Sequence, residues 1–131
     1  MILYSSNDIN FPYNACEILY NENKEYHISD LEFGELIKAL KGHFWAVCDD
    51  NNNLMGCLYF EIRFNNKWFI SGFSARKVTK YVSEAIHTLI KHYNKKKVYS
   101  ETPHRHARIA LLRAGFKKIR YNIYKWEASN G

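Results

Sequence analysis

The chain has 131 residues, of which 47% are hydrophobic and 16% aromatic, and it carries 19 Lys and Arg against 13 Asp and Glu. This length and composition predict one domain with a hydrophobic core and exclude a disordered chain. The longest apolar run is too short to cross a membrane, and polar residues follow directly after Tyr4. We therefore expect a cytoplasmic protein with no signal peptide, no anchor and no membrane partner.

Positive charge is concentrated in the second half of the chain. Residues 1–66 contain 4 Lys or Arg and 10 Asp or Glu, a net charge of −6, whereas residues 67–131 contain 15 and 3, a net charge of +12. This asymmetry predicts that the second half faces an anion, which is a phosphorylated cofactor, nucleic acid or an acidic protein. A basic solvated face is the alternative, and we favour it for the lysines at 95–97.

Cys16, Cys48 and Cys57 are odd in number and show no CxxC spacing. Two of them lie in apolar segments typical of strands. This pattern predicts buried free thiols, and neither a disulfide set nor a zinc site.

The first half of the chain predicts one strand, two helices and a three-stranded meander. Met1 to Tyr4 is typical of a short strand, and Pro12 of the first turn of a helix. The run from Ser29 to Glu32 has the spacing of a capping box, so it predicts a helix over 30–41 that ends before Gly42. The meander follows with strands at 43–49, 54–64 and 67–71 and turns at 50–53 and 65–66.

The second half predicts a long helix, a strand, a shorter helix and a closing strand. The long helix has an apolar stripe with spacings of three and four, formed by Val78, Tyr81, Val82, Ala85, Ile86, Leu89, Ile90 and Tyr93. A strand at 97–102 and a helix at 105–114 follow. In the segment from Lys118 to Trp126, Ile119, Tyr121 and Ile123 alternate with polar residues, which predicts one strand with one buried face.

A helical crossover joins the strand ending near Ser71 to the strand at 97–102, so these two strands should be parallel, with a right-handed connection. This element order, and the pattern His104-x-x-Ala107-x-x-Ala110-Leu111-x-x-Ala114-Gly115-Phe116, resemble the GNAT superfamily of acyl-CoA-dependent N-acyltransferases. The resemblance covers about residues 43–126. It implies a single α+β domain over 1–131, with a mixed, mostly antiparallel sheet of six or seven strands, splayed between the two parallel strands, and about four helices.

The chain departs from the superfamily pattern at three positions. In that pattern an Arg/Gln-x-x-Gly-x-Gly/Ala loop lets backbone amides approach the CoA pyrophosphate, but the matching run from Arg76 to Tyr81 has no glycine. The usual tyrosine acid is replaced by Leu111, and the usual asparagine by His104. No catalytic acid is therefore transferred to this chain by position.

A second resemblance concerns the run from Trp68 to Gly72, followed by Arg76 and Lys77, and the basic helix that enters Gly115. These features are similar to degenerate GNAT-like proteins of tailed bacteriophages. They imply a phage or mobile-element origin, with a role in host takeover, defence evasion or the virus particle, and a location in the host cytoplasm.

A strand end, a basic loop and a helix N-terminus form an anion site, because first-turn amides are unpaired and the helix dipole favours negative charge. The resemblance implies that acetyl-CoA binds there. One side of the predicted site is formed by Gly72, Phe73, Ser74, Arg76, Lys77, Thr79, Lys80 and Tyr81, and the other side by His104 and Arg108. Arginines would supply bidentate phosphate contacts in place of the missing glycine amides. The histidines at 104 and 106 point to different helix faces, so we expect no metal there.

An N-acyltransferase needs a base for the attacking amine and often an acid for the leaving thiolate. The candidate bases are Glu101, at the end of one predicted strand, and Glu61, in another. Tyr99 and Tyr121 are candidate proton donors. The alternative for each carboxylate is an ion pair with a neighbouring Lys or Arg on the sheet surface.

Three functions follow from these patterns. The first is acyl transfer to an amine acceptor, on a protein or a small molecule. The second is a catalytically inactive GNAT-like binding module, which the missing glycines and tyrosine favour. The third is nucleic-acid binding through the basic half, supported by charge alone.

Overall fold

The computed structural model describes residues 1–26, 30–75 and 79–129, and it contains a seven-stranded sheet with strand order β1-β2-β3-β4-β5-β7-β6. Every described strand pair is antiparallel except β4–β5, which is parallel. The strands are β1 (Ile2–Ser5), β2 (Phe44–Cys48), β3 (Leu54–Arg63), β4 (Lys67–Ser74), β5 (Lys97–Glu101), β6 (Lys117–Arg120) and β7 (Ile123–Glu127). The predicted meander and the predicted parallel pair are both confirmed.

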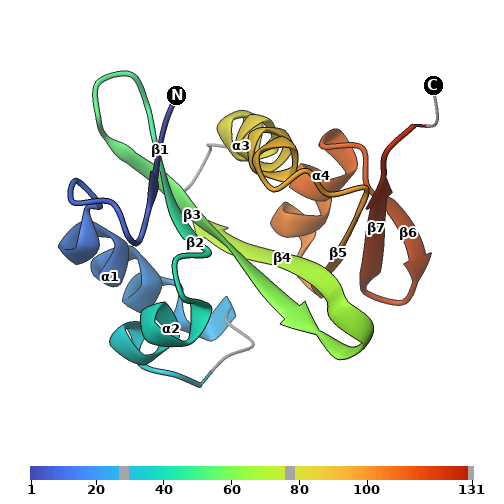
Figure 1. The fold of residues 1–131 in the computed structure, drawn as a ribbon, viewed down its shortest axis with the longest axis horizontal. Helices are drawn as coiled ribbons and strands as arrows, with labels where there is room; N and C mark the ends of the chain where they lie inside the picture. The colour runs from blue at the N-terminus through green and yellow to red at the C-terminus, as the bar shows by residue number, and fades with distance from the viewer. Residues whose placement is uncertain (27–29, 76–78, 130–131) are drawn as a thin grey trace.

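Helices cover both faces of the sheet. The described helices are α1 (Tyr13–Glu22), α2 (Phe33–Leu40), α3 (Thr79–His92) and α4 (Arg105–Arg113), with short 3-10 turns η1 (Lys24–Tyr26) and η2 (Phe64–Asn66). The pair α1 and α2 lies on one side of the central strands, and α3 and α4 lie on the other (Figure 1). The predicted α+β class is confirmed. Among the described residues, no helix has the length and apolar character needed to cross a bilayer.

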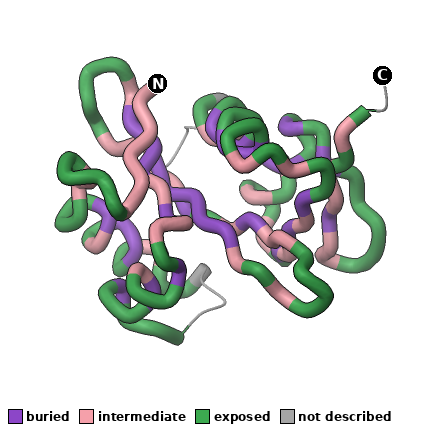
Figure 2. The backbone as a smooth tube through the Cα atoms, in the orientation of Figure 1, coloured by how far each residue is buried: buried purple, intermediate pink, exposed green. Residues whose placement is uncertain are grey.

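The central strands are buried on both faces, and burial in the chain is concentrated there (Figure 2). In β3, Leu58 and Phe60 face α3, whereas Cys57 and Tyr59 face α1 and α2. Successive strand residues point to opposite faces, so each helix layer receives every second side chain. All three cysteines are buried free thiols, as predicted.

The C-terminal segment differs from the prediction of one strand over 118–126. It forms a hairpin, in which β7 lies between β5 and β6. The chain reverses at Asn122, whose φ of 60° places it in the left-handed region that asparagine tolerates. Tyr121, taken as part of the buried face, is 82% exposed at this turn, and Tyr124 is the buried residue.

Helix α2 begins later than the predicted capping box. It starts at Phe33 with Glu32 as its N-cap, and Glu32 makes no side-chain capping bond; Ser29 lies outside the described residues. The hydroxyl of Tyr20 donates to the carbonyl oxygen of Leu31 at 2.7 Å, which holds that carbonyl outside the helix. The predicted end is confirmed, since Lys41 and Gly42 both have positive φ.

Gly72 of β4 is required by packing against β3. A Cβ atom at this position would lie 2.5 Å from the carbonyl oxygen of Cys57 and 2.7 Å from Cδ2 of Leu58. We therefore expect Gly72→Ala to lower the free energy of unfolding by about 1–3 kcal/mol, measured by urea denaturation.

Gly34→Ala is the matched control, because the nearest atom to its added Cβ is the hydroxyl oxygen at the flexible end of Tyr13, at 3.2 Å. It should change stability much less than Gly72→Ala. Equal effects of the two substitutions would contradict the packing role of Gly72.

Candidate functional site

The parallel strands β4 and β5 meet at one point and then separate. Phe69 and Tyr99 are their one bridged backbone pair, and the Ser100 hydroxyl donates to the Ile70 carbonyl oxygen at 2.7 Å just beyond it. From Ser71 to Ser74, β4 pairs only with β3. On the β5 side of the C-terminal end of β4, the backbone groups therefore form no hydrogen bonds with a described strand. This separation is the predicted splay of the two strands.

The helices that follow these two strands run parallel to each other. The Ser83 hydroxyl donates to the Ala110 carbonyl oxygen at 3.1 Å, and a ring nitrogen of His87 contacts the Ala114 carbonyl oxygen. Both contacts join residues 27 positions apart, so the register is constant along the helices. Extended one turn toward the helix N-termini, the same register places the first turns of α3 and α4 next to each other. Two helix N-termini therefore lie at the open end of the β4–β5 pair, where both dipoles favour an anion.

The predicted cofactor residues on the β4–α3 side differ in how much of each is described and exposed. Arg76 and Lys77 lie outside the described residues, and only the backbones of Thr79 and Lys80 are described, in the first turn of α3. Gly72 is exposed, Ser74 is half-buried, and Tyr81 is 39% exposed. Phe73 is a core residue, because its ring packs against Tyr20 and Phe44. Only its backbone can therefore contact a ligand.

The α4 side of the open end contains the other two predicted residues. His104 is the N-cap of α4, and its backbone N–H donates to the Thr102 hydroxyl oxygen at 3.1 Å. Arg108 is exposed one turn later. Leu111, at the position of the tyrosine acid in the GNAT pattern, is 4% exposed within the core. This helix can therefore supply cations and amides, but no acid at that position.

The two predicted bases lie in one ionic cluster around Arg63. Arg63 Nη1 lies 3.0 Å from Glu101 Oε1, and Arg63 Nε lies 4.0 Å from Glu61 Oε2. The guanidinium also lies over the Phe69 ring, 4.1 Å from its centroid. Sequence analysis missed Arg63, although its position two residues after Glu61 on one strand face is a signal for such a pair.

A row of side chains extends this cluster across four strands. Glu61 pairs with Phe69, Phe69 with Tyr99, and Tyr99 with Lys125. The Phe69 and Tyr99 rings stack with centroids 5.4 Å apart. We call this set, with Arg63 and Glu101, the Arg63 face. It places one proton donor and two carboxylates on one surface; Tyr121 lies apart from it, in the β6–β7 turn.

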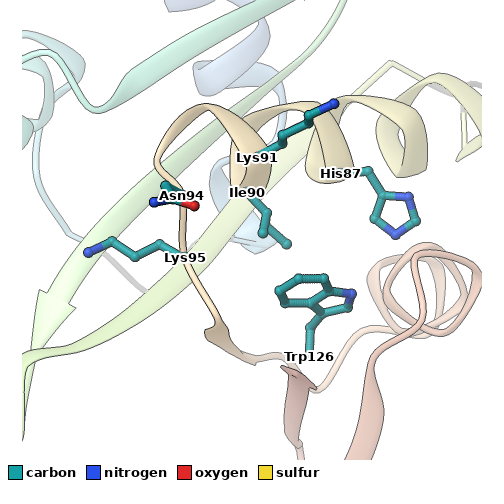
Figure 3. Close-up of a pocket in the computed structure, with 6 residues that line it drawn as sticks. All are labelled: His87, Ile90, Lys91, Asn94, Lys95 and Trp126. Atoms are coloured by element: carbon teal, nitrogen blue, oxygen red, sulfur yellow. The ribbon is translucent and has the colours of Figure 1, made fainter. Parts of the chain in front are cut away.

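Two hollows on the described surface lie away from the open end. The first, of about 390 Å³, is formed by the second half of α3, the following turn and Trp126 of β7. Figure 3 shows the Trp126 ring below Ile90, and Lys95 extending away from it. The second, of about 430 Å³, is lined by residues at the N-terminal ends of β4 and β5, Tyr99 among them.

No protein-family model matches this sequence, and no curated protein matches it either. Solved structures do resemble its fold. A GNAT superfamily phosphinothricin acetyltransferase from Sinorhizobium meliloti, in complex with AcCoA, has a TM-score of 0.72 at 11% identity, over 99% of this chain and 89% of that chain. A GNAT-family acetyltransferase from Bacillus anthracis has a TM-score of 0.69 at 13% identity, over 95% and 93%. An aminoglycoside 6'-N-acetyltransferase complexed with coenzyme A has a TM-score of 0.67 at 12% identity, over 97% of each chain. The chain therefore has the fold of the GNAT acetyltransferases.

Tyr59 lies buried next to the Arg63 face, and its environment predicts a pH effect on stability. Burial raises the pKa of its hydroxyl, the Glu61 charge raises it further, and a hydrogen bond with the Ser71 side chain lowers it in part. The folded-state pKa is therefore above the unfolded value of about 10. The contribution of Tyr59 to the free energy of unfolding is complete below about pH 10. It is lost as the pH rises further, because the unfolded chain releases a proton that the folded chain keeps.

We expect the free energy of unfolding of Tyr59→Phe, measured by urea denaturation across the alkaline range, to fall less steeply with pH than that of the unchanged protein. The two slopes should differ by about 1.4 kcal/mol per pH unit. Tyr121→Phe is the control, because Tyr121 is 82% exposed and should leave the slope unchanged. If Tyr59→Phe kept the original slope, the burial argument would be wrong.

Proposed function

We propose that this protein is an acyl-CoA-dependent N-acyltransferase that transfers an acetyl group from acetyl-CoA to an amine of a protein or a small molecule. The observation that carries the proposal is the separation of β4 and β5 after the Phe69–Tyr99 pair, with the first turns of α3 and α4 at the same end. Solved structures of this fold with AcCoA or coenzyme A support the choice of cofactor.

We propose that the open end binds the pyrophosphate group of the cofactor. First-turn amides of α3 and α4 would bind phosphate oxygens, with Arg76, Lys77 and Lys80 on one side and His104 and Arg108 on the other. The unpaired backbone edge of β4 from Ser71 to Ser74 would bind the extended arm of the ligand. Bound acetyl-CoA would supply the activated acyl group.

The Arg63 face would supply the proton transfers. Arg63 binds Oε1 of Glu101, which leaves Oε2 to accept a proton from the acceptor ammonium directly or through one water. Glu61 is the second candidate base, and the Tyr99 hydroxyl is the candidate donor to the leaving thiolate. Arg63 contacts both carboxylates and is thus a positioning residue. The alternative is that Arg63, Glu61 and Glu101 form a surface ion pair network with no catalytic role.

One structural observation favours a second function, a catalytically inactive GNAT-like binding module. Leu111 is buried in the core where the GNAT pattern has a tyrosine acid, and the run from Arg76 to Tyr81 lacks glycine. A phage-encoded role in host takeover, defence evasion or the particle is compatible with either function. Nucleic-acid binding through the basic half is the third reading, and a steep salt dependence of oligonucleotide affinity would support it.

Calorimetry with acetyl-CoA at low micromolar protein tests the cofactor site. Arg76→Ala should weaken binding about ten- to a hundredfold, since one charge-assisted phosphate contact contributes about 1.5–3 kcal/mol. Arg113→Ala is the control, because Arg113 is an exposed cation at the opposite end of α4. Unchanged affinity of Arg76→Ala would exclude this site. Absence of binding at millimolar acetyl-CoA would favour the inactive module.

Steady-state kinetics with an amine acceptor tests the base. Glu101→Gln should lower turnover by about a hundredfold or more and leave acetyl-CoA affinity nearly unchanged, because a positioned base acts on the transfer step. Glu127→Gln is the matched control, since Glu127 is also a strand carboxylate paired with cations, Lys97 at 3.7 Å and Lys125 at 3.6 Å. A wild-type rate for Glu101→Gln would remove the carboxylate from the mechanism.

A further inference from the structure

The hollow at the N-terminal ends of β4 and β5 is rich in lysine. It has a volume of about 430 Å³, and its lining includes Lys67, Lys95, Lys96 and Lys97, together with the aromatic residues Trp68 and Tyr99. These residues come from two neighbouring segments, the start of β4 and the stretch that contains the turn after α3 and the first residues of β5. The hollow lies at the N-terminal end of β4 and reaches Tyr99, whose strand partner Phe69 is two residues before the start of the open segment at Ser71.

Most of the positive charge in this hollow is not neutralised by the protein. Lys97 pairs with Glu127 at 3.7 Å. Within residues 1–26, 30–75 and 79–129, no carboxylate forms an ion pair with Lys67, Lys95 or Lys96. Three ammonium groups around one hollow repel one another, and a bound anion relieves this repulsion.

The two aromatic rings hold lysines in the hollow. Lys95 Nζ lies 4.0 Å from the Trp68 ring centroid, and Lys67 Nζ lies 5.1 Å from the Tyr99 ring centroid. Such contacts are attractive and orient the ammonium groups. Because lysines already occupy these ring faces, the faces are not free for a base to stack on. The arrangement therefore favours recognition of anionic groups over recognition of nucleobases.

Backbone geometry fixes the two segments that carry the lysines. Asn65 and Asn66 have φ of 59° and 58° in the turn before β4, and Asn94 has φ of 52° in the turn before β5. The Lys95 N–H donates to the Ile90 carbonyl oxygen at 3.1 Å, and the Lys96 carbonyl oxygen accepts from the Ala128 N–H at 2.8 Å. The lysine backbones are thus positioned before any ligand arrives, which lowers the entropic cost of binding.

We propose that this hollow binds a compact polyphosphate group, meaning two or three directly linked phosphates of a small ligand. Three uncompensated positive charges match a polyvalent anion better than a single carboxylate. The volume lies within the range of small-molecule sites, about 300–1,000 Å³. The hollow shares Tyr99 with the Arg63 face but contains none of the predicted cofactor residues, and the inference does not depend on acyl transfer.

Nuclear magnetic resonance with inorganic tripolyphosphate tests the proposal at the hollow itself. The indole N–H signal of Trp68, assigned with Trp68→Phe, should shift and saturate during the titration. The triple variant Lys67→Gln, Lys95→Gln and Lys96→Gln should bind at least ten times more weakly in calorimetry. The double variant Lys117→Gln and Lys118→Gln, on the exposed edge strand β6, should bind as the unchanged protein does.

Two further arms make the result specific. Arg76→Ala should retain the Trp68 shift, which separates this hollow from the cofactor end. Citrate, a compact tricarboxylate, should bind much more weakly than tripolyphosphate. The proposal is overturned by an unperturbed Trp68 signal, by unchanged affinity of the triple variant, by equal citrate binding, or by a single-stranded oligonucleotide that perturbs Trp68 when tripolyphosphate does not.

Discussion

The rest of the structure depends on the single parallel contact between β4 and β5. The Phe69–Tyr99 pair and the hydrogen bond from the Ser100 hydroxyl to the Ile70 carbonyl oxygen join the antiparallel strands β1–β4 to the β5-β7-β6 group. Because these contacts lie near the beginning of β4, its C-terminal half remains unpaired on one side. The same geometry sends the chain into two parallel helices whose first turns share one end. Sheet continuity and the separation of β4 from β5 therefore arise from one short contact.

The two faces of this contact carry different chemistry. On one face, Tyr99 and Phe69 belong to the Arg63 face, where a guanidinium holds two carboxylates. On the other, α3 and α4 cover the core and bring their first turns to the open end. An amine bound over the carboxylates and an acyl donor bound at the helix starts would approach each other through the gap between β4 and β5. The location of Glu101 at the end of β5 is consistent with this geometry.

Positive charge is used differently at the two ends of β4. At its C-terminal end, the first-turn amides and dipoles of α3 and α4 favour an anion, and Arg108 is an exposed cation one turn into α4. At its N-terminal end, no described α-helix begins, and the lysines are held by aromatic rings and turn hydrogen bonds. In the proposed acyltransferase, the missing glycines at 76–81 would leave more of the phosphate recognition to side chains.

Local patterns were sufficient for much of this fold. The helix stripe of α3, the meander turns and the order of elements follow from spacings within a few residues, so the sequence alone determined the α+β class and the parallel crossover. The sequence pattern did not reveal the hairpin at Asn122. Tyr121 lies exposed in the turn, but as an apolar residue it fits the alternation of Ile119 and Ile123. Near the start of α2, the Tyr20 hydroxyl donates to the Leu31 carbonyl oxygen across 11 positions, a contact that local spacing does not reveal. Arg63 and Glu101 are 38 positions apart, and only the tertiary structure decided that they meet, because strand register sets which side chains face each other across a sheet.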